Sequence, residues 1–312
     1  MKKLLLILLC LPLIGFGQQT YVPDDNFEQA LIDLGYDNIL DNYVTTDSIY
    51  SIESLRLFDN NISDLTGIED FILLTQLECS FNPITELDIS KNINLTDLVV
   101  RGCDKLKALD ISQNISLTEL HCIINRLTNL DVSNNINLNI LHCYQNQLTI
   151  LDVSQNTALI DLACRDNHLI SLDVSKNTAL TSLGCSNNKL TTLDVSNNTA
   201  LTGLSCNNNQ LTSLDVSNNT ALTNLYCSLN QLTILNISQN TALIDLECRD
   251  NHLISLDLRN GNYKNSKLKY KNIDFDLRGN PNLTCINVDN VSWSNINLIN
   301  IDSQHYFKKN CH

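Results

Sequence analysis

The sequence has 312 residues and a formal net charge of -14, and only 17% of its residues are charged. So acidic a chain argues against nucleic acid or an anionic membrane as a partner, because both require basic patches on the protein. A chain of this length would normally indicate about two domains. This one is an array of repeats, and such an array grows longer without forming a second hydrophobic core, so its length does not indicate a second domain.

Residues 1–17 have the pattern of a secretory signal peptide. Lys2 and Lys3 precede an apolar run over 4–16, and the small residue Gly17 follows it. We expect cleavage near this point and export of the mature chain. No later apolar run approaches the roughly 20 residues of a membrane helix, so we expect no membrane insertion after cleavage.

Residues 18–51 read as an N-terminal cap. Pro23 and Asp24 are helix-start signals, and apolar residues such as Phe27 and Leu31 follow at helical spacing. We therefore expect a short amphipathic helix that covers the first coil of the array, since an end coil would otherwise expose its core.

Residues 52–260 contain ten units of 21 residues, with two steps of 22. The first half of each unit reads L-x-x-L-x-C-x-x-N-x-L, and the second half reads L-x-x-L-D-V-x-x-N. The first pattern matches the leucine-rich repeat signature, in which every repeat adds one short parallel strand to a solenoid. The units begin at Ile52, Leu74, Leu95, Leu117, Leu138, Leu159, Leu180, Leu201, Leu222 and Leu243.

The nested halves resemble the short IRREKO-type leucine-rich repeats that are common in secreted bacterial proteins. The stretch "NISDLTGIEDF" from Asn61 resembles internalin repeats. This resemblance implies a leucine-rich repeat solenoid with a parallel β-sheet on its concave face. Short strand-like or irregular segments are expected on the convex face.

Residues 261–312 break the period and form the expected C-terminal cap. The sequence Gly279-Asn280-Pro281 marks a turn before a last strand-like segment, "LTCINV". Cys285 and Cys311 bracket this tail, and we expect them to form a disulfide.

A ladder of cysteines recurs along the array, and it could be a metal site, a set of disulfides or core packing. Parallel strands lie about 4.8 Å apart, whereas disulfide Cβ atoms are about 3.8 Å apart. Ligands of a tetrahedral metal must converge, which a linear row does not allow. Leu57 and Val100 occupy the same position in other units, so packing is the preferred interpretation. The ladder comprises Cys79, Cys122, Cys143, Cys164, Cys185, Cys206, Cys227 and Cys248.

Two polar rows accompany the cysteines. An inward asparagine three residues after each cysteine is expected to hydrogen-bond the turn backbone. A row of aspartates on the back is expected to be solvated and hydrogen-bonded, although bridging by Ca²⁺ is the alternative. These aspartates are Asp88, Asp110, Asp131, Asp152, Asp173, Asp194, Asp215 and Asp257.

No catalytic motif or cofactor site is apparent. His121 and His142 lie on neighbouring strands and could share a zinc ion, but only Glu119 offers a third ligand, so exposed histidines are the preferred interpretation. We predict no metal site, no cofactor and no enzyme activity.

The candidate contacts lie on the concave face. Units seven and eight show only small residues on this face, whereas units three to five carry apolar and aromatic side chains and an arginine there. Clusters of aromatic, apolar and arginine side chains are enriched at interaction sites. We predict a secreted or cell-envelope, monomeric, non-enzymatic protein that binds a protein or glycan through this face. The alternative is a structural spacer whose acidic convex face binds cations. The candidate contacts are Val99, Arg101, His121, Ile123, Ile140, His142 and Tyr144, with a weaker patch at Tyr226 and Arg249.

Overall fold

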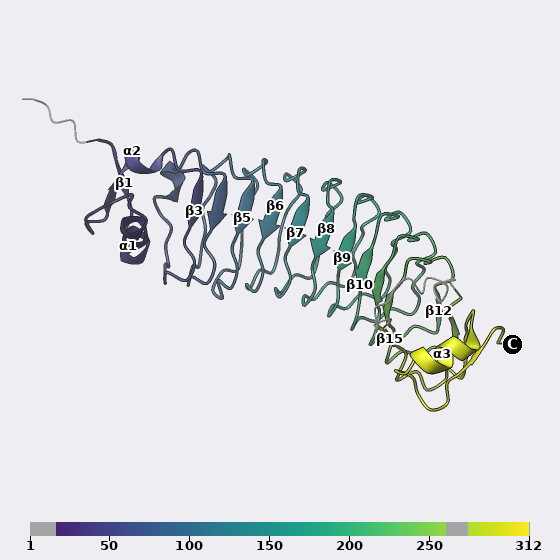
Figure 1. The fold of residues 1–312 in the computed structure, drawn as a ribbon. Helices are drawn as coiled ribbons and strands as arrows, with labels where there is room; N and C mark the ends of the chain where they lie inside the picture. Colours follow the sequence, from purple (N-terminus) through teal and green to yellow (C-terminus); the bar gives the residue numbers. More distant parts are fainter. Residues whose placement is uncertain (1–16, 260–273, 312) are drawn as a thin grey trace, which may run out of the picture.

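The computed structural model describes residues 17–259 and 274–311. The chain winds into a row of stacked coils that runs from α1 near the N-terminus to α3 near the C-terminus (Figure 1). This is the predicted leucine-rich repeat solenoid. The predicted signal sequence up to residue 16 and the predicted array boundary at 260 lie outside the described residues.

One face of the solenoid is an eleven-stranded parallel sheet, to which each coil contributes a strand of three residues. The central residue of each strand points inward, and leucines pair in register from coil to coil, as Leu162 does with Leu183. We call the solvent side of this sheet the sheet face. Its strands are β3 (Ser54–Arg56), β4 (Gln76–Glu78), β5 (Asp97–Val99), β6 (Glu119–His121), β7 (Ile140–His142), β8 (Asp161–Ala163), β9 (Ser182–Gly184), β10 (Gly203–Ser205), β11 (Asn224–Tyr226), β13 (Asp245–Glu247) and β15 (Asp274–Asp276).

The second halves of the coils are mostly irregular, as the repeat pattern allows. Near the C-terminus they form a second parallel sheet of β12 (Ile234–Asn236), β14 (Ser255–Asp257), β16 (Cys285–Asn287) and β17 (Tyr306–Lys308). The predicted strand "LTCINV" is β16. The first sheet extends one coil beyond the ten predicted units, because β15 pairs with β13.

The N-terminal cap contains the predicted helix, α1 (Asp25–Asp33). Asp24 caps it by accepting the N–H groups of Asn26 and Phe27, and its second oxygen accepts the hydroxyl of Ser63 at 2.7 Å. One side chain therefore fixes the helix to the first coil. The remaining elements are β1 (Gln19–Tyr21), which pairs with β2 (Tyr43–Thr45), α2 (Thr46–Ile49), the 3-10 helix η1 (Ile68–Asp70) and α3 (Val291–Asn297). No described helix is long and apolar enough to cross a membrane.

The cysteine ladder lies in the core, as predicted. All eight ladder thiols are free and fully buried, and so is Cys103. Burial raises the pKa of Cys122, Cys164 and Cys248 to about 12, so the thiolate is strongly disfavoured. The cysteines act as small apolar side chains in a narrow slot.

The asparagine ladder joins successive coils. The amide of Asn167 donates to the carbonyl oxygens of Cys164 (3.1 Å) and, one coil earlier, Cys143 (3.0 Å), while its oxygen accepts the N–H of Leu148. A second buried row at the back works similarly, since the Asn156 amide donates to the carbonyls of Val132 and Asn135. These bonds satisfy the turn backbone that the sheets leave unpaired.

The turn after each strand of the first sheet places one residue in the left-handed region, with φ between +51° and +69°. Most coils meet this demand with asparagine, aspartate or glycine, which tolerate the conformation. Three coils instead use large apolar residues, Phe81, Ile124 and Leu229. Their presence there costs backbone strain, especially for the β-branched isoleucine.

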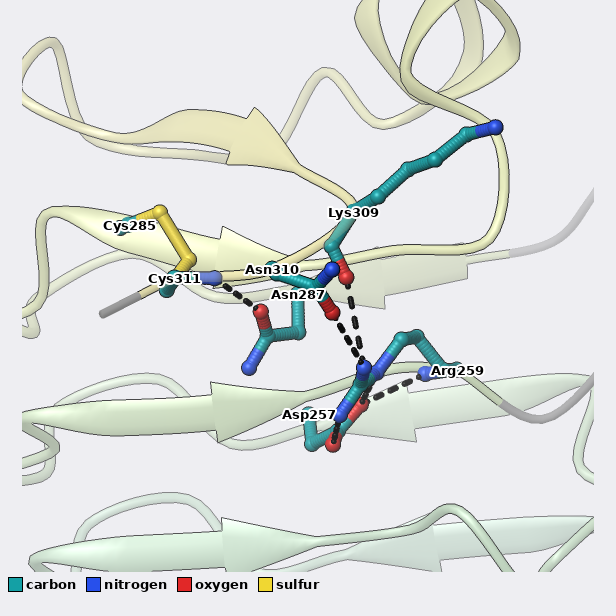
Figure 2. The surroundings of a disulfide bond; sticks show 7 residues. All are labelled: Asp257, Arg259, Cys285, Asn287, Lys309, Asn310 and Cys311. Carbon is teal, nitrogen blue, oxygen red and sulfur yellow. Dashed lines mark hydrogen bonds and ion pairs between the residues drawn. A yellow bond between two sulfur atoms is a disulfide. The ribbon is translucent and has the colours of Figure 1, made fainter.

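Cys285 and Cys311 form the predicted disulfide, with Cα atoms 5.8 Å apart. Figure 2 shows Asn287 accepting the N–H of Cys311, and Arg259 joining Asp257 on β14 to the side chain of Asn310. The tail is thus fastened to the back of the last coils.

The buried thiols predict a reactivity pattern. In the chain from residue 18 onward, nine free cysteines are expected to stay unlabelled by Ellman's reagent in the native state and to react in denaturant. Quantifying released thionitrobenzoate at neutral pH measures this. Rapid labelling of several thiols in the native protein would contradict core packing.

The left-handed turn predicts an unusual stabilising substitution. Ile124→Asn should raise the free energy of unfolding by about 1 kcal/mol, because asparagine tolerates this backbone better than isoleucine. The reverse change Asn187→Ile should lower it by about 2 kcal/mol, because it also removes the hydrogen bond from Asn187 to Asp166. Urea unfolding followed by circular dichroism measures both. A lower stability for Ile124→Asn would contradict the strain assignment.

Candidate binding surface

Three places of each coil face outward on the sheet face: the first and third residues of the strand and the one two positions later, although the last of these is buried in some coils. In coils β9 and β10 these are Ser182, Gly184, Gly203 and Ser205 among other small polar groups. In β5 to β8 larger side chains replace them. We call the group Val99, His121, Ile140, His142, Tyr144, Asp161 and Arg165 the four-strand patch.

Two histidines form the centre of the four-strand patch. The rings of His121 and His142 pack edge to face with centroids 4.7 Å apart. Nε2 of His142 lies 3.0 Å from Oδ2 of Asp161 on the next strand, and Nε2 of His121 lies 3.8 Å from Glu119. Burial lowers the pKa of His121, and the neighbouring His142 lowers it further. The hydrogen bond from His142 holds the pKa of Asp161 below its ordinary value.

An arginine and a tyrosine extend this patch. The guanidinium carbon of Arg165 lies 4.4 Å from the centre of the Tyr144 ring, within cation–π distance. Tyr144 in turn lies beside His142, with ring centroids 6.4 Å apart. The residues Asp161, His142, Tyr144 and Arg165 therefore form one continuous, mutually oriented group.

Ile123 corrects the predicted contact set. Its side chain is only 6% exposed. Arg101 and Tyr144 hold the same place on the two adjoining coils, so the shorter isoleucine lies between two longer side chains. Ile123 supports the face and offers little surface to a ligand.

The other predicted residues divide into two groups. Val99 and Ile140 are half-buried at the ends of β5 and β7, in the four-strand patch. Tyr226 lies on β11, four coils away from His142, and donates its hydroxyl to Asp245 at 2.6 Å. Arg249 is exposed near it and approaches Asp250 at 3.9 Å. The weaker patch is thus separate from the four-strand patch.

Several neighbours of the predicted contacts were missed by sequence reasoning. Asp161 and Arg165 complete the patch, but period and residue type alone did not mark them. Phe58 and Phe81 are exposed by 54% and 38%, and their rings pack 5.2 Å apart beside Arg101. A signal for Phe81 existed, because a large apolar residue occupies a repeat position that holds Asn, Asp or Gly in most other units.

Comparisons with known proteins agree with this architecture. No protein-family model matches the sequence. The solved functional domain of internalin J from Listeria monocytogenes, described as including a cysteine ladder, is 33% identical with a TM-score of 0.67; the match covers 87% of this chain and 68% of that domain. The chain belongs to the internalin-type leucine-rich repeat proteins. The row of buried thiols in this chain is a cysteine ladder as well.

Two further matches define the extent of the likeness. Full internalin J of Listeria monocytogenes serotype 4b (strain F2365) is 42% identical over 72 residues, which are 23% of this internalin-type chain and 8% of that protein. The chain therefore matches a small part of that relative's length. A leucine-rich repeat protein of Leptospira interrogans is 22% identical with a TM-score of 0.55, covering 77% of this chain and 70% of that one, and shows a likeness of fold alone.

The acidic row on the back of the internalin-type array is hydrogen-bonded, as predicted. In each case Oδ1 accepts the backbone N–H two residues later. That N–H belongs to a serine for seven of the eight aspartates, as Ser154 donates to Asp152 at 2.9 Å, and to Arg259 for Asp257. Asn236 makes the same bond to Ser238. The backbone and hydroxyl of this serine lower the pKa of Asp152 and of Asp131. Within 17–259 and 274–311, no group of three His, Cys, Asp or Glu side chains is arranged to hold a metal ion.

These aspartates predict a one-sided pH dependence. Their pKa is lower in the folded state than the ordinary 3.8, so the ionised carboxylates stabilise the folded state above pH 3.8. This contribution is lost as the pH falls through the lower pKa values of the folded state. The melting temperature should therefore fall below pH 3.8 from this cause.

The control uses the chain's own Asn236. Replacing Asp131, Asp152 and Asp173 with asparagine keeps the turn bond without a titrating group, and should flatten the acid limb of the melting curve. A clear rise in melting temperature with millimolar calcium, reversed by chelator, would instead show that cations bridge the row.

Proposed function

We propose that this chain is a non-enzymatic binding protein, secreted or held in the cell envelope, which takes a protein or glycan ligand on its sheet face. The observation that carries the proposal is the four-strand patch. Solenoids present extended surfaces of this kind to ligands, and the patch lies on β5 to β8, toward the N-terminal half of the array.

The patch is not needed to build the coils. Small residues such as Ser182 and Gly203 occupy the same outward places in β9 and β10, and those strands pair in the same register. The core is complete beneath both regions, because each strand from β5 to β10 buries its central leucine. Folding therefore does not require the large outward side chains on β5 to β8, and a binding role accounts for them.

The patch is oriented in advance of binding. Asp161 fixes His142 by a hydrogen bond, and Arg165 stacks on Tyr144. Side chains that are already ordered lose less conformational entropy when a ligand arrives. Tyrosine and arginine are also the types that contribute most at protein interfaces. This combination of charged, polar and aromatic side chains suits a ligand that has both polar groups and apolar surface, such as a protein segment or a sugar ring.

The competing role as a cation-binding spacer rests on the acidic row. Each row carboxylate already accepts a backbone N–H with one oxygen, as Asp194 does from Ser196, and the row supplies a single carboxylate per coil. Calcium requires six to eight oxygen ligands around each ion. The binding role is therefore the better supported of the two.

The proposal predicts the effect of a double substitution. Replacing His142 and Tyr144 with alanine should weaken saturable binding of the labelled protein to intact bacterial or host cells by at least about tenfold, since it removes two interface side chains. Flow cytometry over a concentration series measures this.

The matched control is Gly203→Ala on the same face. A Cβ there would contact nothing within 4 Å, so binding should remain unchanged. Binding that fails to saturate, or that the double substitution leaves intact, would contradict the proposed site.

A further inference from the structure

The turns beyond the strands of coils one to four carry a second group of side chains, of which Ile124 is half-buried and the other three are exposed. Phe58 follows β3, Phe81 follows β4, Arg101 follows β5 and Ile124 follows β6. We call these four residues the turn cluster. Among them only Arg101 belongs to the contacts predicted from sequence.

Two members of the turn cluster are held against the backbone preference of their residue type. Phe81 and Ile124 have φ angles of +57°, in the left-handed region. Equivalent turns hold Asp59, Asn187 and Asn208, so the fold itself does not require large apolar residues there. Burial does not offset the strain at Phe81, whose side chain is 38% exposed. Strain of this kind concentrates at functional sites.

The neighbouring coils fix the Phe81 ring in one orientation. A Cβ on Gly102 would lie 2.8 Å from two ring atoms of Phe81, so the ring lies directly on this glycine of the next coil. Phe58 packs against the other side at 5.2 Å, in an edge-on arrangement.

Arg101 adds one positive charge to this apolar surface. Its guanidinium carbon lies 5.4 Å from the centre of the Phe81 ring. No hydrogen bond or ion pair joins that guanidinium to any described side chain of the chain. Its N–H groups can therefore take a carboxylate with two hydrogen bonds.

We propose that the turn cluster docks a peptide segment of a partner protein in which a large apolar side chain stands next to a carboxylate. The apolar side chain covers Phe58 and Phe81, and the carboxylate pairs with Arg101. The inference rests on the proposed binding function but places its anchor at the turns rather than at the four-strand patch. Arg101 is the only charged member of the turn cluster, so charge complementarity selects for an acidic group at this point.

Peptide selection tests the inference directly. The probe is a phage-displayed library of random dodecapeptides, panned on immobilised residues 18–312. Recovered sequences should be enriched in Asp or Glu next to Phe, Trp or Leu. The synthetic consensus peptide should then bind about tenfold more weakly to Phe81→Asn and to Arg101→Ser by fluorescence anisotropy.

Leu229→Asn is the strain-matched control. Leu229 has the same left-handed backbone and is 45% exposed, but Asn208 and Asp250 flank it at this position, so it has no aromatic neighbour there. Its substitution should leave peptide affinity unchanged. Since asparagine suits this turn, Phe81→Asn should stay folded, which its melting temperature checks.

The inference is overturned if the selected peptides lack an acidic residue beside an apolar one. It is also overturned if Phe81→Asn and Arg101→Ser bind the consensus peptide as the natural chain does, or if acidic glycans bind the cluster and no peptide does. Peptide binding that survives the alanine substitutions at His142 and Tyr144 supports the turn cluster, even where cell binding shows the four-strand patch to be wrong.

Discussion

Inward asparagine side chains hold the coils of this protein together, and the other features of the array depend on them. Each short strand pairs with its neighbours for only three residues, so the turn backbone beyond the strands also needs side-chain partners. An amide such as that of Asn188 binds carbonyls in its own coil and in the coil before, while its oxygen accepts an N–H from that earlier coil. Because an unpaired buried backbone group is costly, this arrangement fixes the spacing of the repeat.

The same constraint explains the cysteines. The carbonyl of Cys164 accepts bonds from Asn167 and Asn188, so the backbone at this cysteine must approach the asparagines of two coils. A thiol is small, apolar and fully buried here, and it fills the remaining space without competing for those amides. The row of thiols is therefore a consequence of packing, and its raised pKa values follow from burial.

With the inner positions fixed, variation is confined to outward places, and these are where binding chemistry can arise. On β5 to β8 the outward residues form a connected group through His142, Asp161, Tyr144 and Arg165. At the turns the left-handed backbone favours Asn, Asp or Gly. Phe81 and Ile124 stand out because holding them in this conformation costs backbone strain. Residues that follow the repeat rule describe the scaffold, while residues that break it on the surface are the candidates for function.

The solenoid, the inward cysteine and asparagine rows, the helical cap and the disulfide between Cys285 and Cys311 could all be predicted from the sequence. It could do so because a period of 21 residues, repeated in ten units, allows one packing solution for the leucines. Which outward residues share a surface could be seen only in the folded chain. Ile123 and Tyr144 look equally exposed in the repeat, but longer neighbours flank Ile123, and contacts between coils depend on side-chain length and direction. The strained turns and the stacking of Phe81 on Gly102 also required coordinates, because a backbone angle and a contact between coils are set by the fold and not by the repeat pattern.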